Sequence, residues 1–184
     1  MNKIYKVFPG GKFKVLTFSY DDGKIEDRRL VKLFNKYNLK ATFNLNTGII
    51  DPAIRIPQEE WPELYAGHDI AVHTFTHPTM IRLNDYAVIR EILEDKNNLE
   101  KIFHRPITGF AYPNGSFDSR IVDIAKSVGI KYARVTNDRY AATKAAENYA
   151  SSADGPIPIG DENGFFMPDD YMRWVPTCHH NHNL

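Results

Sequence analysis

The chain has 184 residues, of which 42% are hydrophobic and 25% charged, so it is long enough for one domain with a well-buried core. Lysine plus arginine (23) balances aspartate plus glutamate (23), which argues against nucleic acid or an anionic membrane as a partner. No apolar run approaches the roughly 20 residues that span a bilayer, and the N-terminus lacks the apolar core of a signal peptide. The single cysteine, Cys178, cannot form an internal disulfide. We therefore expect residues 1–184 to form a single cytoplasmic domain.

Short strands alternate with amphipathic helices along the chain, which is typical of α/β folds with a mainly parallel sheet. Strands are predicted at residues 12–19, 41–45, 69–73, 108–112 and 132–135. Apolar residues recur at helical spacing around residues 30–37, from near Asn84 to Pro106, and from Asp118 or Ser119 to Gly129. A short helix is expected at 59–66. Asn38 is suited to end the first helix in a left-handed conformation.

Beyond Thr136 the periodicity weakens, and residues 141–184 hold too little helix or strand signal to finish a closed barrel. A (β/α) barrel needs roughly seven or eight strand–helix units, whereas about five strands are predicted. We therefore expect an α/β fold that forms a distorted or incomplete (β/α) barrel. Because an open sheet leaves an unpaired edge, we also expect either a homodimer that buries this edge or an irregular tail folded across it.

Three predicted strands end in polar residues, and α/β folds keep their sites at the C-terminal ends of strands. The three runs are Asp21-Asp22-Gly23, His73-Thr74-Phe75-Thr76-His77 and Ala111-Tyr112-Pro113-Asn114-Gly115. Asp-Asp-Gly is also a good turn sequence, and the two histidines are also compatible with unrelated structural roles. As a functional site, one aspartate with two histidines makes a three-ligand set that leaves positions for water and substrate, as in catalytic zinc sites. The other aspartate then remains free for proton transfer in the reaction.

In this order, the three runs resemble the motifs of the polysaccharide deacetylase family, the NodB-like carbohydrate esterases. Residues 17–23 (Thr-Phe-Ser-Tyr-Asp-Asp-Gly) correspond to the first motif, with two extra residues before the aspartates. Residues 73–77 match the second motif, and residues 111–115 align with the third. The resemblance implies a fold of the same type over most of the chain, from about residue 13 to 135. It also suggests a truncated member, because the family normally continues beyond the length seen here.

The resemblance implies specific roles. Asp21 becomes the general base, whereas Asp22, His73 and His77 become the ligands of Zn²⁺ or of another divalent cation such as Co²⁺ or Ni²⁺. The backbone N–H of Asn114 becomes an oxyanion donor, and Trp174 becomes the aromatic wall of the acetyl pocket. The implied reaction is metal-dependent hydrolysis of N- or O-acetyl groups on a carbohydrate substrate, classed with hydrolases of non-peptide carbon–nitrogen bonds.

Two features depart from the family pattern. Ala111 stands where the family typically has the arginine that tethers the base, and the late Leu-x-His-like motif, which supplies a histidine acid, has no clear match. His179 or His180 is a candidate for a replacement acid, but the sequence favours the alternative that they are exposed terminal histidines without a catalytic role. These departures favour an alternative function, a catalytically impaired carbohydrate-binding pseudoenzyme that retains the metal. A further alternative, an unrelated metal hydrolase or a His₂-carboxylate iron enzyme, fits the order of the ligands less well.

Overall fold

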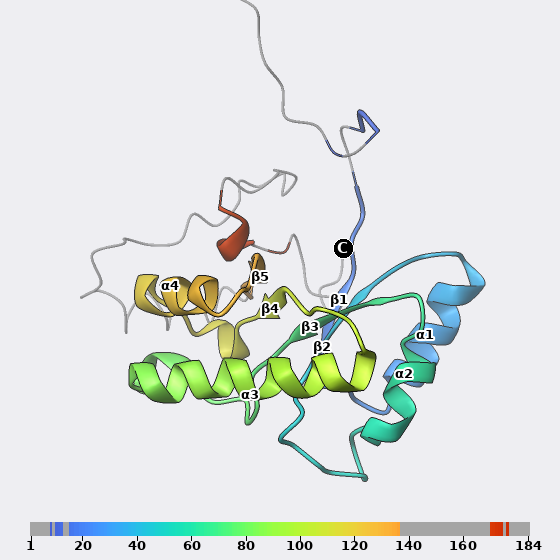
Figure 1. Ribbon diagram of the computed structural model, residues 1–184. Helices are drawn as coiled ribbons and strands as arrows, with labels where there is room; N and C mark the ends of the chain where they lie inside the picture. Colours follow the sequence, from blue (N-terminus) through green and yellow to red (C-terminus); the bar gives the residue numbers. More distant parts are fainter. Residues whose placement is uncertain (1–7, 9, 13–14, 137–169, 175, 177–184) are drawn as a thin grey trace, which may run out of the picture.

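One sheet of five parallel strands forms the centre of the computed structural model, which describes residues 8, 10–12, 15–136, 170–174 and 176. The strands follow each other in sequence order, β1 to β5, across the sheet (Figure 1). They are β1 (Ser19–Asp21), β2 (Thr42–Leu45), β3 (Asp69–Val72), β4 (Gly109–Ala111) and β5 (Tyr132–Arg134). The sheet curls into a half-barrel, so that Arg134 Nε on β5 lies 3.0 Å from Ser19 Oγ on β1. The predicted incomplete (β/α) barrel is confirmed.

Helices connect the strands and cover the outside of the sheet (Figure 1). The α-helices are α1 (Asp27–Lys36), α2 (Trp61–Leu64), α3 (Asp85–Phe103) and α4 (Ser119–Ser127). The short 3₁₀ helices are η1 (Gln58–Glu60), η2 (Met80–Arg82), η3 (Pro113–Gly115) and η4 (Tyr171–Arg173). The expected helix ends are present: the Asn84 and Asp118 side chains accept hydrogen bonds from the first turns of α3 and α4, and Asn38 adopts a φ of 52° after α1.

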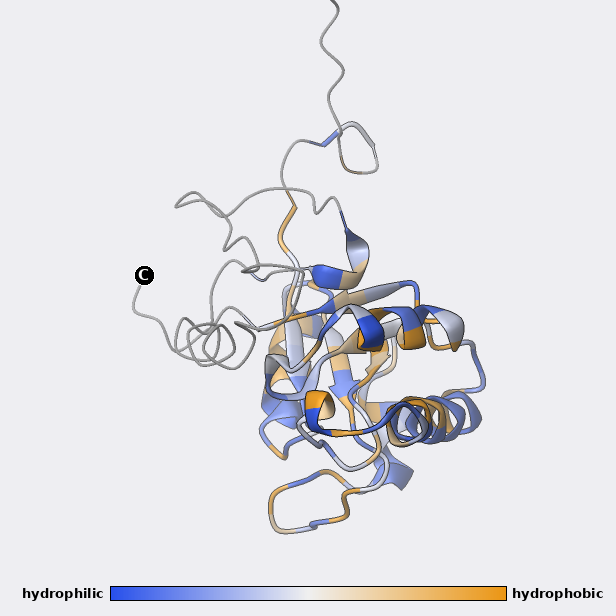
Figure 2. Ribbon diagram, turned by 90° about the vertical axis from the view of Figure 1, so that its left-hand side faces the viewer, coloured by the Kyte–Doolittle hydropathy of each residue, from blue (hydrophilic) through white to orange (hydrophobic). Residues whose placement is uncertain are grey.

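The core lies between the sheet and its helices. Strand residues such as Phe43, Leu45 and Val72 are fully buried, as expected for strands of a parallel sheet that is covered by helices. Ile92 and Leu99 of α3 are also fully buried. In Figure 2 the hydrophobic residues gather where the helices face the sheet, and the outer faces of the helices are hydrophilic. This packing makes the sheet a rigid platform for the loops that follow its strands. In the described part of the chain, no helix has both the length and the apolar character needed to cross a membrane.

The first predicted strand was placed too early. Only Ser19 of the predicted range 12–19 belongs to β1, which continues to Asp21. Val15 and Leu16 are 46% and 72% exposed and have no regular structure. The physical reason is the short partner: β2 begins only at Thr42, whose N–H donates to Phe18 O, so earlier residues find no neighbouring strand there. Apolar alternation alone therefore overestimated the length of the strand.

The described tail residues cover the edge of β5. Trp174 N–H donates to Ala133 O, and Val135 N–H donates to Trp174 O. The Tyr112 hydroxyl donates to the carbonyl of the buried Met172 at 3.0 Å. For residues 170–174, this agrees with the expected irregular tail across the edge, and the homodimer stays a prediction. Cys178, the histidine pair that follows it and most of residues 141–184 lie outside the described residues.

Candidate active site

The two aspartates at the end of β1 and the two histidines after β3 lie together at the C-terminal end of the sheet. One ligand atom from each of Asp22, His73 and His77 lies within 4.8 Å of the others, and His77 Nε2 is 3.9 Å from Asp22 Oδ1. Tetrahedral zinc ligands at about 2.1 Å from the ion stand roughly 3.4 Å apart. The three side chains are therefore close to the geometry that one divalent ion requires, and two imidazoles with one carboxylate are suitable donors for it.

Unusual backbone conformations concentrate in this region. Among the described non-glycine residues, six have a positive φ, and two of these, Asn38 and His104, end helices. The other four are Asp22 (81°), Thr74 (66°), His77 (56°) and Asn114 (57°). Left-handed conformations are costly for side chains with a Cβ, and they gather where a site needs them. His73 and His77 therefore lie on an irregular loop rather than on a helical turn.

His73 is held in the tautomer that a metal ligand needs. Its Nδ1 lies 2.8 Å from Ala111 O, and because a carbonyl only accepts, Nδ1 carries the proton and Nε2 is left with its lone pair. The ring is 2% exposed, and burial lowers the pKa of His73 despite the opposing charge of Asp21. A neutral imidazole with a free Nε2 is the form that binds a divalent ion.

Two buried polar residues fix the backbone around His73. Asp95, fully buried on α3, accepts hydrogen bonds from the His73 N–H (3.0 Å), the Thr47 N–H (2.7 Å) and the Thr47 hydroxyl (2.8 Å). Burial raises the pKa of Asp95 to about 8. The Asn46 side-chain amide donates to the carbonyls of His73 (2.5 Å) and Thr74 (2.9 Å). The loops after β2 and β3 are thus tied together and to α3.

Arg55 supports Asp22, the third candidate ligand. Its guanidinium donates from Nη1 to Asp22 O and to Asn46 Oδ1, the latter at 3.1 Å, and its Nη2 lies 3.4 Å from Asp22 Oδ1. Lys24 Nζ lies 3.4 Å from the other carboxylate oxygen of Asp22. Two cations therefore neutralise this carboxylate and stabilise its left-handed backbone position. Arg55 was not predicted, because its position in an irregular loop gives no pattern that could be detected in the sequence.

Asp21 is held by a different set of partners. Its Oδ1 accepts a hydrogen bond from the Asn44 amide at 2.8 Å and forms an ion pair with Arg134, while Oδ2 lies 3.9 Å from His73 Nε2. Burial would raise the pKa of Asp21, but His73, Arg134 and the Asn44 hydrogen bond outweigh it and lower the pKa to about 2. The carboxylate is therefore ionised throughout the neutral range, as a proton acceptor must be. Asn44 and Arg134 were not predicted either.

Asn114 and Trp174, predicted to contact substrate, lie near the rim of this end of the sheet. Asn114 is exposed in the turn after β4, and its amide nitrogen lies 3.5 Å from Thr79 Oγ1, on the loop that follows the histidines. Trp174 forms a parallel bridge with Arg134 and packs its ring 6.1 Å from that of Tyr171. Their roles as oxyanion donor and acetyl-pocket wall stay predictions.

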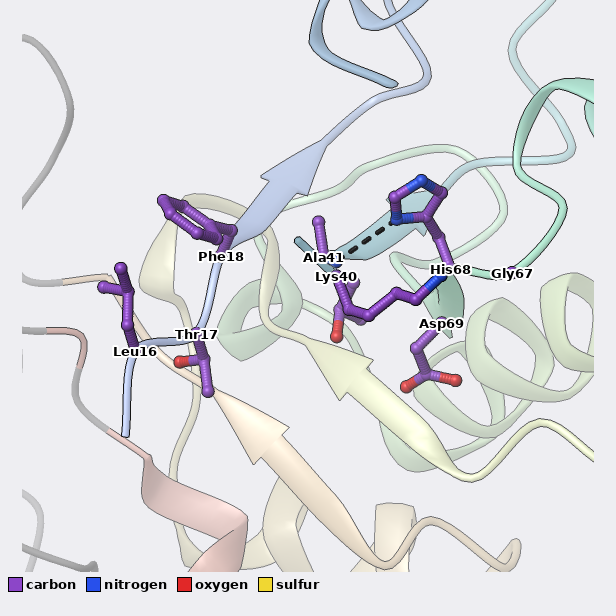
Figure 3. A pocket seen from close by; sticks show the side chains of 9 residues that line it. Leu16, Thr17, Phe18, Lys40, Ala41, Gly67, His68 and Asp69 are labelled. Atoms are coloured by element: carbon purple, nitrogen blue, oxygen red, sulfur yellow. Dashed lines mark hydrogen bonds between the residues drawn. The ribbon is translucent and has the colours of Figure 1, made fainter. Parts of the chain in front are cut away.

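A separate pocket lies at the opposite end of the sheet (Figure 3). Its lining comes from the first residues of β2 and β3 and from the segments that precede β1, β2 and β3: residues 16–18, 40–42 and 67–69. Within it, the Ala41 N–H donates to His68 Nδ1 at 3.2 Å. Because the candidate ligands follow the same strands at their other ends, this pocket is not part of the active site.

Asp27, which begins α1 just after the aspartate pair, makes stability depend on pH. It is 3% exposed, accepts a hydrogen bond from the Tyr65 hydroxyl at 2.8 Å, and burial raises its pKa to about 7. In the unfolded chain an aspartate has a pKa of about 3.9, so between pH 4 and 7 the folded protein binds a proton that the unfolded chain has released. Asp27 therefore lowers the free energy of unfolding by up to about 1.4 kcal/mol per pH unit over this range.

The matching experiment compares wild type with Asp27→Asn by urea denaturation at a series of pH values. Asparagine keeps an acceptor for Tyr65 but does not titrate. We expect the wild type to lose stability relative to the variant as the pH rises from 4 to 7, and the difference to become constant above it. A difference that does not change with pH would contradict this assignment.

The comparison with known protein families agrees with the fold and with the positions of the motifs. A family model described as polysaccharide deacetylase matches residues 9–133, more than half of the 184 residues. The chain belongs to the polysaccharide deacetylase family. The resemblance found in the three motifs is thereby confirmed, although the match itself does not assign a role to any single residue.

Relatives of this deacetylase-family chain are distant and longer. It is 26% identical over 117 residues to chitin deacetylase 1 of Cryptococcus neoformans, which covers 63% of this chain and 24% of that protein. It is 24% identical over 122 residues to YlxY of Bacillus subtilis, covering 66% of this chain and 37% of that one. The chain thus spans well under two thirds of these relatives.

Solved structures similar to this deacetylase-family chain include both an enzyme and a pseudoenzyme. The deacetylase PplD of Streptococcus pyogenes, solved in complex with acetate, has a TM-score of 0.65 and 25% identity, over 71% of this chain and 58% of that one. The protein BA3943 of Bacillus anthracis, described as a pseudoenzyme of carbohydrate esterase family 4, has a TM-score of 0.55 and 22% identity, over 71% and 45%. The second likeness shows the fold alone.

Proposed function

We propose that this polysaccharide deacetylase family member hydrolyses N- or O-acetyl groups of a carbohydrate. Asp22, His73 and His77 are its metal ligands, and Asp21 is its general base. The observation that carries the proposal is the placement of Asp21, a carboxylate held by Arg134 and Asn44 with its Oδ2 3.9 Å from Nε2 of the candidate ligand His73. A base that is deprotonated and oriented is what the pseudoenzyme alternative lacks.

The residues divide the work of the reaction. A divalent ion, when bound, supplies Lewis-acid polarisation of the acyl carbonyl and makes water a better nucleophile at neutral pH. Asp21 accepts the proton of the water whose oxygen forms the new bond to the acyl carbon. The carbon–nitrogen or carbon–oxygen bond to the sugar then breaks, and the leaving group takes up the proton that Asp21 accepted, which returns the carboxylate to its ionised form. The products are acetate and a free amine or hydroxyl on the sugar.

Zinc is the expected ion because two neutral imidazoles and one carboxylate suit it, and Co²⁺ or Ni²⁺ suit the same donors. The backbone N–H of Asn114 is the proposed donor to the developing oxyanion, and Trp174 is the proposed wall against the acetyl methyl group. Both proposals rest on the motif positions and on the placement of these residues near the rim.

The alternative function is a metal-retaining, carbohydrate-binding pseudoenzyme. The observation in its favour is Ala111, which leaves the third motif without an arginine side chain. The two functions predict the same metal content, but they differ in turnover. An assay of acetate release therefore separates them.

We expect the metal-loaded protein to release acetate from acetylated sugar oligomers, and removal of the metal by a chelator to stop the release. Testing N-acetylated glucosamine oligomers and O-acetylated xylose oligomers in parallel distinguishes the two bond types. Re-addition of Zn²⁺ after removal of the chelator should restore the rate. One bound metal per chain with no acetate release from either substrate would instead support the pseudoenzyme.

A further inference from the structure

Arg134 at the end of β5 makes a contact that crosses the open mouth of the half-barrel. β1 and β5 are the first and last strands of the sheet, separated by three strands in the hydrogen-bonded order (Figure 1). Arg134 nevertheless forms an ion pair with Asp21 Oδ1 and donates from Nε to Ser19 Oγ at 3.0 Å, both at β1. The curl of the sheet therefore places a guanidinium from the last strand on a carboxylate of the first.

The register of the sheet relates this arginine to Ala111. Ala111 and Arg134 are direct partners in the parallel pairing of β4 and β5. Ala111 is fully buried, its methyl group carries no charge and no hydrogen-bond donor for a carboxylate, and its carbonyl is occupied by His73 Nδ1. The positive charge is therefore provided by Arg134 on β5, the residue that is paired with Ala111 of β4 in the sheet.

The surroundings of Arg134 restrict its orientation. Its side chain is only 18% exposed, and its Nη1 donates to Val135 O at 3.3 Å. On its other side, β5 is bordered by Trp174, which bridges to Arg134 itself. An arginine side chain that is mostly buried and already hydrogen-bonded to Ser19 and Val135 loses little further side-chain entropy when it binds a carboxylate, and its planar guanidinium fixes the direction of that carboxylate.

We propose that Arg134 is the positioning residue of the catalytic base. It is supplied from β5 in place of a side chain at position 111, and it orients Asp21 toward the metal centre. The inference rests on the proposed deacetylase function. Arg134 acts through Asp21 and contacts none of the three candidate metal ligands in the interactions described, so its loss affects turnover and leaves metal binding intact. Ala111 is then compatible with an active enzyme.

The test compares Arg134→Ala and Arg134→Lys with a matched control, Arg105→Ala. Arg105 also pairs with an aspartate, Asp69 at 3.3 Å, but at the opposite end of the sheet. We expect Arg134→Ala to lower kcat about 10²-fold with KM within about twofold of wild type, because a base misplaced by about 1 Å costs this much. Metal content should stay at the wild-type level, Arg134→Lys should recover part of the loss, and the control should match wild type.

Added guanidinium ion separates positioning from a structural role. At concentrations that leave the protein folded, guanidinium should occupy the vacated site and raise the kcat of Arg134→Ala at least about tenfold. Sodium chloride at the same ionic strength should not raise it. Full activity in Arg134→Ala, or a loss of activity that guanidinium does not restore and that is accompanied by loss of metal, would overturn the inference.

The contact can also be tested when the protein is inactive, which keeps this inference separate from the proposed function. Thermal unfolding of Asp21→Ala, Arg134→Ala and the double variant measures whether the two side chains interact. We expect the double variant to melt within about 2 °C of the less stable single variant, because each substitution removes the same interaction. If the two shifts in Tm simply add, Arg134 does not hold Asp21.

Discussion

Asp21→Asn is expected to reduce acetate release by about 10³-fold, within the 10²–10⁴-fold range of general acid–base catalysis. Asparagine keeps the size of the side chain and an acceptor for Arg134, but it cannot take a proton from water. Because Asp21 is held by Arg134 and Asn44, and the three candidate ligands are other residues, the variant should bind metal as the wild type does. The measurement is initial-rate acetate release together with elemental analysis of the same samples.

The control for this variant is Asp123→Asn, a change of the same kind on the exposed face of α4. It should leave both the rate and the metal content unchanged. Turnover of Asp21→Asn at the wild-type rate would refute the role of Asp21 as base. A loss of metal along with activity would show that Asp21 belongs to the metal site instead.

His77→Ala has the second large effect, on metal affinity. The substitution leaves two of the three candidate ligands, and loss of even an outer partner of a metal ligand costs about 10–100-fold in affinity. We therefore expect the affinity for Zn²⁺ to fall at least about 100-fold and acetate release to be lost with it. Elemental analysis after dialysis against a weak chelator measures the first effect, and titration with Zn²⁺ quantifies it.

The matched control is His104→Asn, which changes an exposed histidine that ends α3 and keeps a residue suited to its positive φ of 51°. Wild-type metal content is expected in this variant. Equal metal content in wild type and His77→Ala would remove His77 from the metal site and leave the second motif without its proposed function.

The sequence was sufficient to predict the alternation of strands and helices and the incomplete barrel. Helix periodicity and capping residues such as Asn84 and Asp118 are local signals, and they correctly predicted where helices begin. The predicted bounds of the first strand were wrong because the length of this strand depends on its pairing with β2, which lies more than twenty residues away in the sequence. Strand boundaries set by pairing cannot be deduced from the apolar pattern of one segment.

The residues that support the site were missed for a related reason. Arg134 meets Asp21 across 113 residues of sequence, and Asn44 meets it across 23, so only the folded sheet brings them together. The sequence did contain one indication of a supporting residue. Asp95 interrupts the apolar stripe of α3 between Ile92 and Leu99, and a charged residue at a buried helical position usually forms hydrogen bonds or ion pairs. The candidate metal ligands, in contrast, could be identified from the sequence because their motifs are short and lie at the ends of predicted strands.

The central claim is that Asp22 is a metal ligand and the adjacent Asp21 is the general base. A crystal structure with anomalous data at the zinc edge tests this claim most directly. We expect one anomalous peak about 2.0–2.2 Å from an Asp22 carboxylate oxygen, His73 Nε2 and His77 Nε2. Asp21 should remain outside bonding distance of the ion and paired with Arg134. A zinc ion bonded to Asp21, or no peak among these three ligands in zinc-loaded crystals, would contradict the proposed site.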